Sequence, residues 1–201
     1  MQRLRELSRR VEAVYSEIAD TFSNYQQRQG LQCRTGCGEC CLAPTIEATT
    51  LEMLPLALHL FDIGRAEQTL EQLDQLTEPQ GCLFYQKLSF DGKQGQCSVY
   101  QQRPSICRMF GAAGYRDKTG QTSLSVCKTI KADHPAKYQQ GLIMLQSSLP
   151  PLMMQSKEQV NELDYQLGNR HYPINTALQL ALEQVMFKAC YSFEQSDQQI
   201  A

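Results

Sequence analysis

Cysteine is the residue type whose number and spacing in this chain could support chemistry. Eight of its nine cysteines lie in one block, and the block opens with the motif Cys33-x3-Cys37-x2-Cys40-Cys41. Metal coordination requires such a spacing, whereas ordinary core packing does not. Thiolates are soft ligands that select zinc, the iron of iron–sulfur clusters or copper(I). The candidate metal ligands are Cys33, Cys37, Cys40, Cys41, Cys82, Cys97, Cys107 and Cys127.

The segments outside the cysteine block favour an intracellular protein. The segment MQRLRELSRRVEAVY is rich in arginine and has no apolar run, which argues against a secretory signal peptide. Apolar runs such as 54–61 are too short to span a bilayer. We therefore expect a cytoplasmic protein, where disulfides are rare and clustered cysteines are metal ligands or redox groups.

The net charge of -2 creates no field that would draw the chain to nucleic acid or to a membrane. We expect neither as a partner. The expected partner is an unidentified protein, such as a redox partner.

Hydrophobic periodicity predicts a helical framework on both sides of the cysteine block. In residues 3–27 apolar side chains recur every three or four positions, which indicates one buried face of an amphipathic helix that ends near Gly30. Thr50 is a candidate cap for a helix over 51–61. Further helices are predicted over 63–76, 135–148, 156–167 and 175–193, and Cys190 falls in the apolar stripe of the last one, where we expect it in the core.

Between these helices the pattern changes. Residues 81–100 contain two short runs rich in Phe, Tyr and Val around a Gly-containing turn, which predicts a small hairpin or an irregular pair of loops, with a cysteine on each arm. Arg103-Pro104 then predicts the start of a short helix with Cys107 and Phe110, because proline suits an early helical position. A second loop is expected at 111–121.

The predicted fold class is mainly α: a single small domain over 1–201, with an irregular cysteine-rich metal-binding core and at most a short β-hairpin. The metal-binding region is expected at 33–127, and residues 133–201 are expected to form a helical C-terminal extension packed on it.

Several ligand arrangements are compatible with the spacing. Adjacent side chains diverge, so Cys40 and Cys41 would serve two metals, or one would ligate beside a free thiol, or the pair would form a strained vicinal disulfide. Eight cysteines suit two four-cysteine sites, and they also suit one [4Fe–4S] cluster with additional thiols. Cys37-x2-Cys40 is a zinc-type knuckle, while the singly spread later cysteines favour an iron–sulfur cluster slightly.

Basic residues outnumber acidic ones around the later cysteines. This excess would offset the charge of a thiolate centre. The alternatives are a small anionic ligand beside the metal, or a solvated basic face. The residues concerned are Arg34, Arg103, Arg108, Arg116, Lys118, Lys128 and Lys131.

Two separated motifs resemble one known family. The first is Cys33-x3-Cys37-Gly38-x-Cys40-Cys41, and the second is Cys97-x2-Tyr100-x2-Arg103-Pro104-x2-Cys107-Arg108-x-Phe110. Together they resemble the YkgJ-type cysteine-cluster family, a zinc- or iron-chelating domain. The resemblance covers 33 to about 127 and implies that six cysteines are metal ligands: Cys33, Cys37, Cys40, Cys41, Cys97 and Cys107. It implies the same less firmly for Cys82, and Cys127 lies beyond its sharpest part.

Tyr100 and Arg103 stand between two of these ligands, and we expect them to support the cofactor. In this hypothesis the Arg103 guanidinium donates a hydrogen bond to cluster sulfur or to a loop carbonyl.

Three functions compete. The first is an iron–sulfur protein with a redox or accessory role, and the second is a zinc-stabilised structural or binding module. A related cysteine segment in flagellin lysine N-methylases implies the third, a cluster-dependent lysine-modifying enzyme. The only Gly-rich candidate for its cofactor, 111–114, is a weak signal. The sequence therefore predicts a metal and leaves the reaction open.

Overall fold

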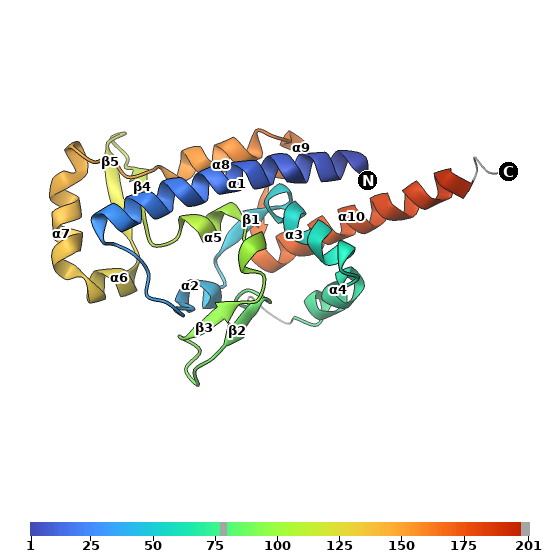
Figure 1. Cartoon of the computed structure of the whole chain (residues 1–201), viewed down its shortest axis with the longest axis horizontal. Helices are drawn as coiled ribbons and strands as arrows, with labels where there is room; N and C mark the ends of the chain where they lie inside the picture. The colour runs from blue at the N-terminus through green and yellow to red at the C-terminus, as the bar shows by residue number, and fades with distance from the viewer. Residues whose placement is uncertain (77–79, 198–201) are drawn as a thin grey trace.

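The computed structural model describes residues 1–76 and 80–197, with side chains described as far as Tyr191. The predicted fold class is confirmed, because the described chain is mainly helical and its strands form only short pairs (Figure 1). The helices are α1 (Gln2–Gln29), α2 (Glu39–Leu42), α3 (Thr50–Asp62), α4 (Ala66–Asp74), α5 (Ser105–Met109), α6 (Lys128–Asp133), α7 (Pro135–Ile143), α8 (Met153–Asn161), α9 (Tyr165–Gly168) and α10 (Ile174–Asp197).

The N-terminal helix forms as predicted. One face of α1 is buried from Leu4 to Tyr25, and polar residues occupy the opposite face. Gly30 ends the helix in the left-handed conformation, with φ of 60°, which glycine adopts without a steric penalty. Figure 1 shows α1 running along most of the molecule, with α8 beside it.

Helix α3 has apolar residues on nearly all sides. This sequence suits its position, since α1 and α10 both pack against it. Its N-terminus corrects the prediction by one residue: the cap is Thr49 and not Thr50. The Thr49 hydroxyl accepts a hydrogen bond from the Glu52 backbone N–H at 3.2 Å, and the Glu52 carboxylate accepts one from the Thr49 N–H at 2.8 Å. This reciprocal capping box satisfies two backbone donors at once, which Thr50 could not achieve without an acidic residue three positions later.

The helices after the cysteine block exist as predicted, with shifted ends. Helix α7 ends at Ile143 and continues as a short 3₁₀ turn, η2 (Met144–Gln146), while the predicted helix over 156–167 is divided into α8 and α9. The predicted helix over 63–76 is confined to α4.

Cys190 is exposed, so the prediction that it lies in the core is wrong. The buried face of α10 runs through Ala181, Leu182, Val185 and Ala189, and Cys190 is one position beyond that face. One step along a helix turns a side chain by about 100°, which moves it to the solvent side.

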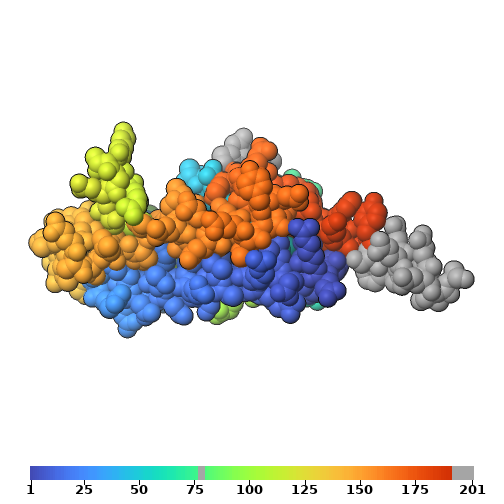
Figure 2. All heavy atoms as spheres, turned by 90° about the horizontal axis from the view of Figure 1, so that it is seen from above, coloured from blue at the N-terminus to red at the C-terminus, as the bar shows by residue number. Residues whose placement is uncertain are grey.

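The strands form three antiparallel pairs in the described chain. They are β1 (Glu47–Thr49) with β6 (His171–Pro173), β2 (Tyr85–Lys87) with β3 (Gly95–Cys97), and β4 (Ala112–Arg116) with β5 (Thr122–Val126). The β2–β3 hairpin was predicted. Residues 111–121 are not a simple loop, because β4 and β5 form a second hairpin whose turn, in yellow-green, projects from the surface in Figure 2.

The sequence signal of this second hairpin lies in its turn. The Asp117 carboxylate accepts hydrogen bonds from the backbone N–H groups of Thr119 and Gln121, and Gly120 adopts φ of 80°. Asp and Gly are the residues that such a turn favours.

The buried side chains form two clusters. The main core lies among α1, α3, α5 and α10, and the small core consists of Tyr25, Leu31, Ala112, Leu124, Val126 and Ile130. Within the described residues, none of the helices combines the length and the apolar character that a membrane-spanning helix requires.

Candidate metal centre

Seven of the eight predicted ligand cysteines line one cavity of about 860 Å³. The cavity lies between the C-terminal half of α1, the first cysteine motif, the β2–β3 hairpin and α5. The lining cysteines are Cys33, Cys37, Cys40, Cys41, Cys82, Cys97 and Cys107; Cys127 lies outside the lining. Segments up to 74 residues apart in sequence therefore supply thiols to one space.

The first cysteine motif is held by its contacts with the β2–β3 hairpin. The Gly38 N–H donates to the Lys93 carbonyl and the Gly95 N–H donates to the Gly36 carbonyl, both at 2.9 Å. Gly38 is required here, because an added Cβ would lie 1.6 Å from the hydroxyl oxygen of Tyr85. The short helix α2 then carries the vicinal pair Cys40-Cys41.

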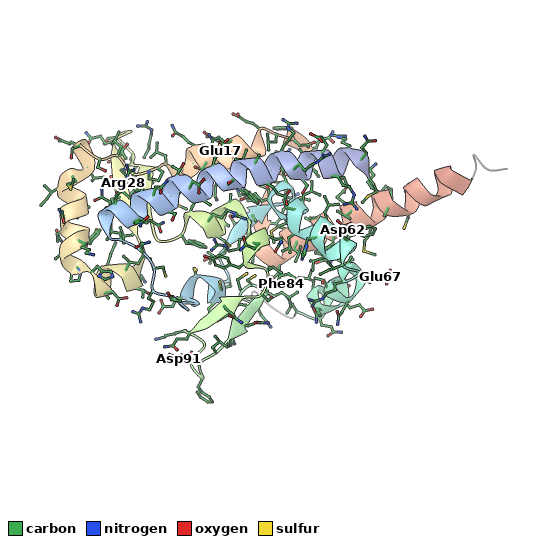
Figure 3. All side chains as sticks on the ribbon, viewed as in Figure 1. Glu17, Arg28, Asp62, Glu67, Phe84 and Asp91 are labelled. Atoms are coloured by element: carbon green, nitrogen blue, oxygen red, sulfur yellow. The ribbon has the colours of Figure 1, made fainter. Side chains whose placement is uncertain are left out.

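The hairpin supplies Cys97 from β3, opposite Tyr85. Cys82 is not on an arm as predicted; it precedes β2, and its N–H donates to the Cys41 carbonyl at 2.9 Å. Figure 3 shows Phe84 where the hairpin meets the body of the molecule and Asp91 at the far end of the hairpin. Phe84 is buried in the main core, so it anchors the hairpin over the cavity.

Helix α5 supplies Cys107. The helix begins after Pro104 and ends at Met109, so Phe110 directly follows it and does not lie within it as predicted. The Ser105 hydroxyl donates a hydrogen bond to the Glu52 carboxylate, which is only 1% exposed. This bond joins the helix of Cys107 to α3.

Sequence reasoning did not identify Glu52 or Ser105 as supports of the site. The spacing Thr49-x-x-Glu52 is a capping-box signal that could have located the carboxylate. Its second role, as the acceptor for a serine 53 residues away, depends on tertiary packing.

Cys127 approaches from the other side of the first motif. It stands at the start of α6, and its N–H donates to the Gly111 carbonyl at 2.8 Å. Helix α6 is tied to the motif by a paired Arg34–Asp133 contact, at 2.8 and 3.0 Å, and by a 3.2 Å hydrogen bond from the Thr129 hydroxyl to the Glu39 carboxylate. These contacts bring Cys127 close to Cys33.

The environment of the thiols favours their neutral form while no metal is bound. Burial, opposed in part by a hydrogen bond from the Phe84 backbone, raises the pKa of Cys82 to about 11. Burial and the neighbouring Cys82 also raise the pKa of Cys107, and burial raises that of Cys97. A bound cation would have to displace these protons.

Two further raised pKa values belong to thiols of the first cysteine motif. The adjacent Cys41 thiol, followed by burial, raises the pKa of Cys40. Partial loss of hydration, followed by the neighbouring Cys37, raises the pKa of Cys33 to about 12. Cys127 contributes to the same shift.

Arg103 lines the cavity, and one hydrogen-bond donor of its side chain has no acceptor. Its guanidinium carbon lies 3.6 Å from the ring centre of Tyr100, and its Nε is buried without a hydrogen-bond partner. Its charge lowers the pKa of Cys97 and of Cys107 against the larger effect of burial. Arg103 and Tyr100 therefore line the same cavity as the thiols, and their supporting role stays a prediction.

The other basic residues near the cysteines differ in their partners. Arg108 donates to the backbone carbonyls of Arg103 and Gln101, and Arg34 pairs with Asp133. Arg116 donates to the Gly120 carbonyl in the distant β4–β5 turn. Arg34, Arg103 and Arg108 all line the cavity, but the guanidinium groups of Arg34 and Arg108 are engaged with protein acceptors.

Across the described chain, no three side chains of His, Cys, Asp or Glu are already arranged to hold a metal ion. The thiols fit a soft metal in type and line one cavity, and ligation would require their sulfur atoms to move from their positions in this structure. A cysteine side chain changes its direction by moving between staggered rotamers, without any backbone change.

Comparison with known proteins agrees with the motifs. Residues 32–128 match the model of the family CxxCxxCC, described as "Putative zinc- or iron-chelating domain", and the matched segment includes Cys127. The resemblance stated from the sequence is thereby confirmed. Neither the curated proteins nor the solved structures provide a match to the chain.

Proposed function

We propose that the chain, whose residues 32–128 match the model of a zinc- or iron-chelating domain family, holds an iron–sulfur cluster, of the [4Fe–4S] type, and has a redox or accessory role. The observation that carries this proposal is the convergence of seven thiols on one cavity. The proposed metal ligands are drawn from Cys33, Cys37, Cys40, Cys41, Cys82, Cys97, Cys107 and Cys127.

The cavity is large enough to admit a polyatomic group. A water molecule occupies about 30 Å³ of liquid, whereas the cavity has about 860 Å³. A cluster of several iron and sulfur atoms would bring its edges within reach of thiols from several segments.

The charge distribution supports the same assignment. Thiolates around a cluster accumulate negative charge, which hydrogen-bond donors and cations in the second layer stabilise. Arg103 provides both, because its buried Nε–H has no protein acceptor and its charge acts on Cys97 and Cys107. Tyr100 holds the guanidinium plane by stacking.

One feature favours a zinc-stabilised module as the second candidate. Cys37 and Cys40 have knuckle-like spacing, with Gly36 at φ of 73° just before Cys37 and with Cys40 in the first turn of α2. Structural zinc sites use this kind of spacing. A single ion at the knuckle would stabilise the loop without any redox role.

Elemental analysis of the full chain purified without air distinguishes these candidates. Iron with an equal amount of acid-labile sulfide and a brown colour are expected. Zinc without sulfide would favour the structural module instead. A chain that retains neither metal would contradict the proposal. The exposed Cys190→Ser variant is the matched control, because it removes a thiol that lies away from the cavity lining.

A further inference from the structure

The first cysteine motif and the β2–β3 hairpin meet along a short backbone pairing. Cys37 pairs with Gln94 in an isolated antiparallel bridge, so the motif runs beside the hairpin like a short extra strand. Figure 1 shows the hairpin next to α2, which continues the motif. Both segments contribute cysteines to the cavity lining, so the fit between them determines where the thiols of one lie relative to those of the other.

Tyr85 stands on the face of the hairpin that carries Cys97. The two residues are directly opposite each other in the β2–β3 register, so their side chains share a face. Gly95, two residues before Cys97, belongs to that face as well. The Tyr85 hydroxyl donates a 2.6 Å hydrogen bond to the Gly92 carbonyl in the turn. The side chain is therefore fixed at its base by the strand and at its tip by the turn.

Two glycines leave the space that the Tyr85 ring occupies. A Cβ added at Gly38 would overlap the hydroxyl and the ring of Tyr85, and a Cβ added at Gly95 would overlap the ring and the Gln86 carbonyl. Gly38 belongs to the motif and Gly95 to the hairpin, so the ring touches both segments. The φ of Gly38 is -113°, a value that alanine also adopts, so the requirement for glycine there comes from the ring.

Ligand candidates lie on both sides of this contact. Cys37 and Cys40 flank Gly38 in sequence, and Cys97 is opposite Tyr85. A centre that draws ligands from both segments requires them within about 0.5 Å of the productive arrangement, and packed supporting side chains provide that accuracy. The ring adds such a contact to the backbone hydrogen bonds that Gly38 and Gly95 make across the same boundary.

We propose that Tyr85 is a positioning residue of the metal centre, and that its ring, seated against Gly38 and Gly95, sets the first cysteine motif against Cys97. This inference rests on the proposed metal-binding function and deepens it. Tyr85 acts through the cysteines and does not ligate the metal itself. The centre then depends on a matched pair, a large ring on the hairpin and a glycine on the motif, and a change on either side alone displaces the thiols.

Variants of the full chain, purified without air, test the matched pair. Gly38→Ala and Tyr85→Ala are each expected to bind metal about 10- to 100-fold more weakly, measured by competition with a coloured chelator. In the double variant the added methyl group has room, so its affinity is expected to equal that of Tyr85→Ala alone. Independent roles would instead multiply the two losses.

The conservative variant Tyr85→Phe separates the ring from its hydroxyl. It keeps the ring and loses the hydrogen bond to Gly92, so the expected loss of affinity is about tenfold or less. Its visible circular dichroism, which reports how the ligands are arranged around a cluster, should match that of the unmodified protein, whereas Tyr85→Ala should change it. Tyr115→Ala, in the β4–β5 hairpin and outside the cavity lining, is the control.

Far-UV circular dichroism checks that each variant is folded. Where Tyr85→Ala fails to fold, Tyr85→Leu replaces it. Leucine keeps apolar volume at the base of the side chain and leaves the place of the phenol hydroxyl open for the methyl group of Gly38→Ala.

The outcomes separate this inference from the proposed function. If Gly38→Ala weakens metal binding equally with and without the Tyr85 ring, or if Tyr85→Ala changes neither affinity nor spectrum, the inference is wrong while the function stands. If the unmodified chain holds zinc without sulfide, the function moves to the zinc module. The spectrum of the cobalt(II)-substituted protein then replaces the visible signal, and the same comparison decides the inference. An unmodified chain without metal would contradict both.

Discussion

The guanidinium carbon of Arg103 lies 3.6 Å from the ring centre of Tyr100, and this stacking places a buried, unpartnered Nε–H beside Cys97 and Cys107. A buried donor without an acceptor costs about 1–3 kcal/mol. A sulfur atom of a bound metal centre would supply the acceptor. The missing hydrogen bond would therefore cost free energy in the metal-free chain, and metal binding would recover it.

Replacing Arg103 should weaken metal retention without unfolding the chain. Arg103→Ala removes the donor and the charge together, and loss of such a supporting residue costs about 10- to 100-fold in metal affinity. Arg103→Lys keeps the charge and loses the stacked plane, so we expect an intermediate effect. The rate of metal transfer to a chelator measures both. Arg116→Ala, in the distant β4–β5 hairpin, is the control; unchanged retention in Arg103→Ala would refute the supporting role.

Metal uptake should depend steeply on pH. The pKa of Cys82 is raised to about 11 and that of Cys33 to about 12, from an ordinary value of about 9. At neutral pH these thiols carry protons in the metal-free chain, and each must release its proton to ligate. Apparent affinity should therefore rise as pH rises, by about tenfold per pH unit for each proton released.

Titration with zinc in weakly buffered solution measures the released protons directly. Several protons per metal are expected. An uptake that released none would show that the thiols are not the ligands.

The metal-free protein should lose stability in alkaline solution. Thiols of the unfolded chain ionise near pH 9, while those of Cys82 and Cys33 stay protonated in the folded chain up to about 11 and 12. A pKa that is raised on folding contributes its full stabilisation below the unfolded value and loses it as pH rises through the folded one. The free energy of unfolding should fall between about pH 9 and pH 12.

Urea denaturation of the metal-free chain at several pH values checks this expectation. Cys82→Ser should reduce the slope in that window, because it removes one of the shifted groups. A slope that is unchanged in this variant would mean that other ionisations cause the loss.

Breaking the bond between α5 and α3 should loosen the part of α5 that carries Cys107. In Ser105→Ala the Glu52 carboxylate loses a donor in a buried place, and hydrogen bonds to charged groups contribute about 1.5–3 kcal/mol. We expect the free energy of unfolding to fall by about that amount and Cys107 to react faster with a thiol reagent. Ser147→Ala, at an exposed turn, should change neither. Normal stability together with normal reactivity of Cys107 would show that the bond does not position the helix.

The helical framework and the metal chemistry were accessible from the sequence because both depend on local spacing. The apolar repeat of α1 specifies which face must leave water whatever it packs against, and the left-handed Gly30 marks its end. The motif around Cys37 places thiols within one short loop, so their shared chemistry needs no knowledge of the fold. The family match over 32–128 confirms that interpretation.

The grouping of the distant cysteines was decided only by tertiary structure. Cys82, Cys107 and Cys127 are separated along the chain, and their neighbours depend on contacts such as those of Ser105 with Glu52 and of Arg34 with Asp133. Such contacts join residues 53 and 99 positions apart, and no local propensity encodes them. The wrong core assignment of Cys190 has the same origin, because the apolar residues near it fit more than one face of α10 and only packing shows that the buried face passes through Ala189.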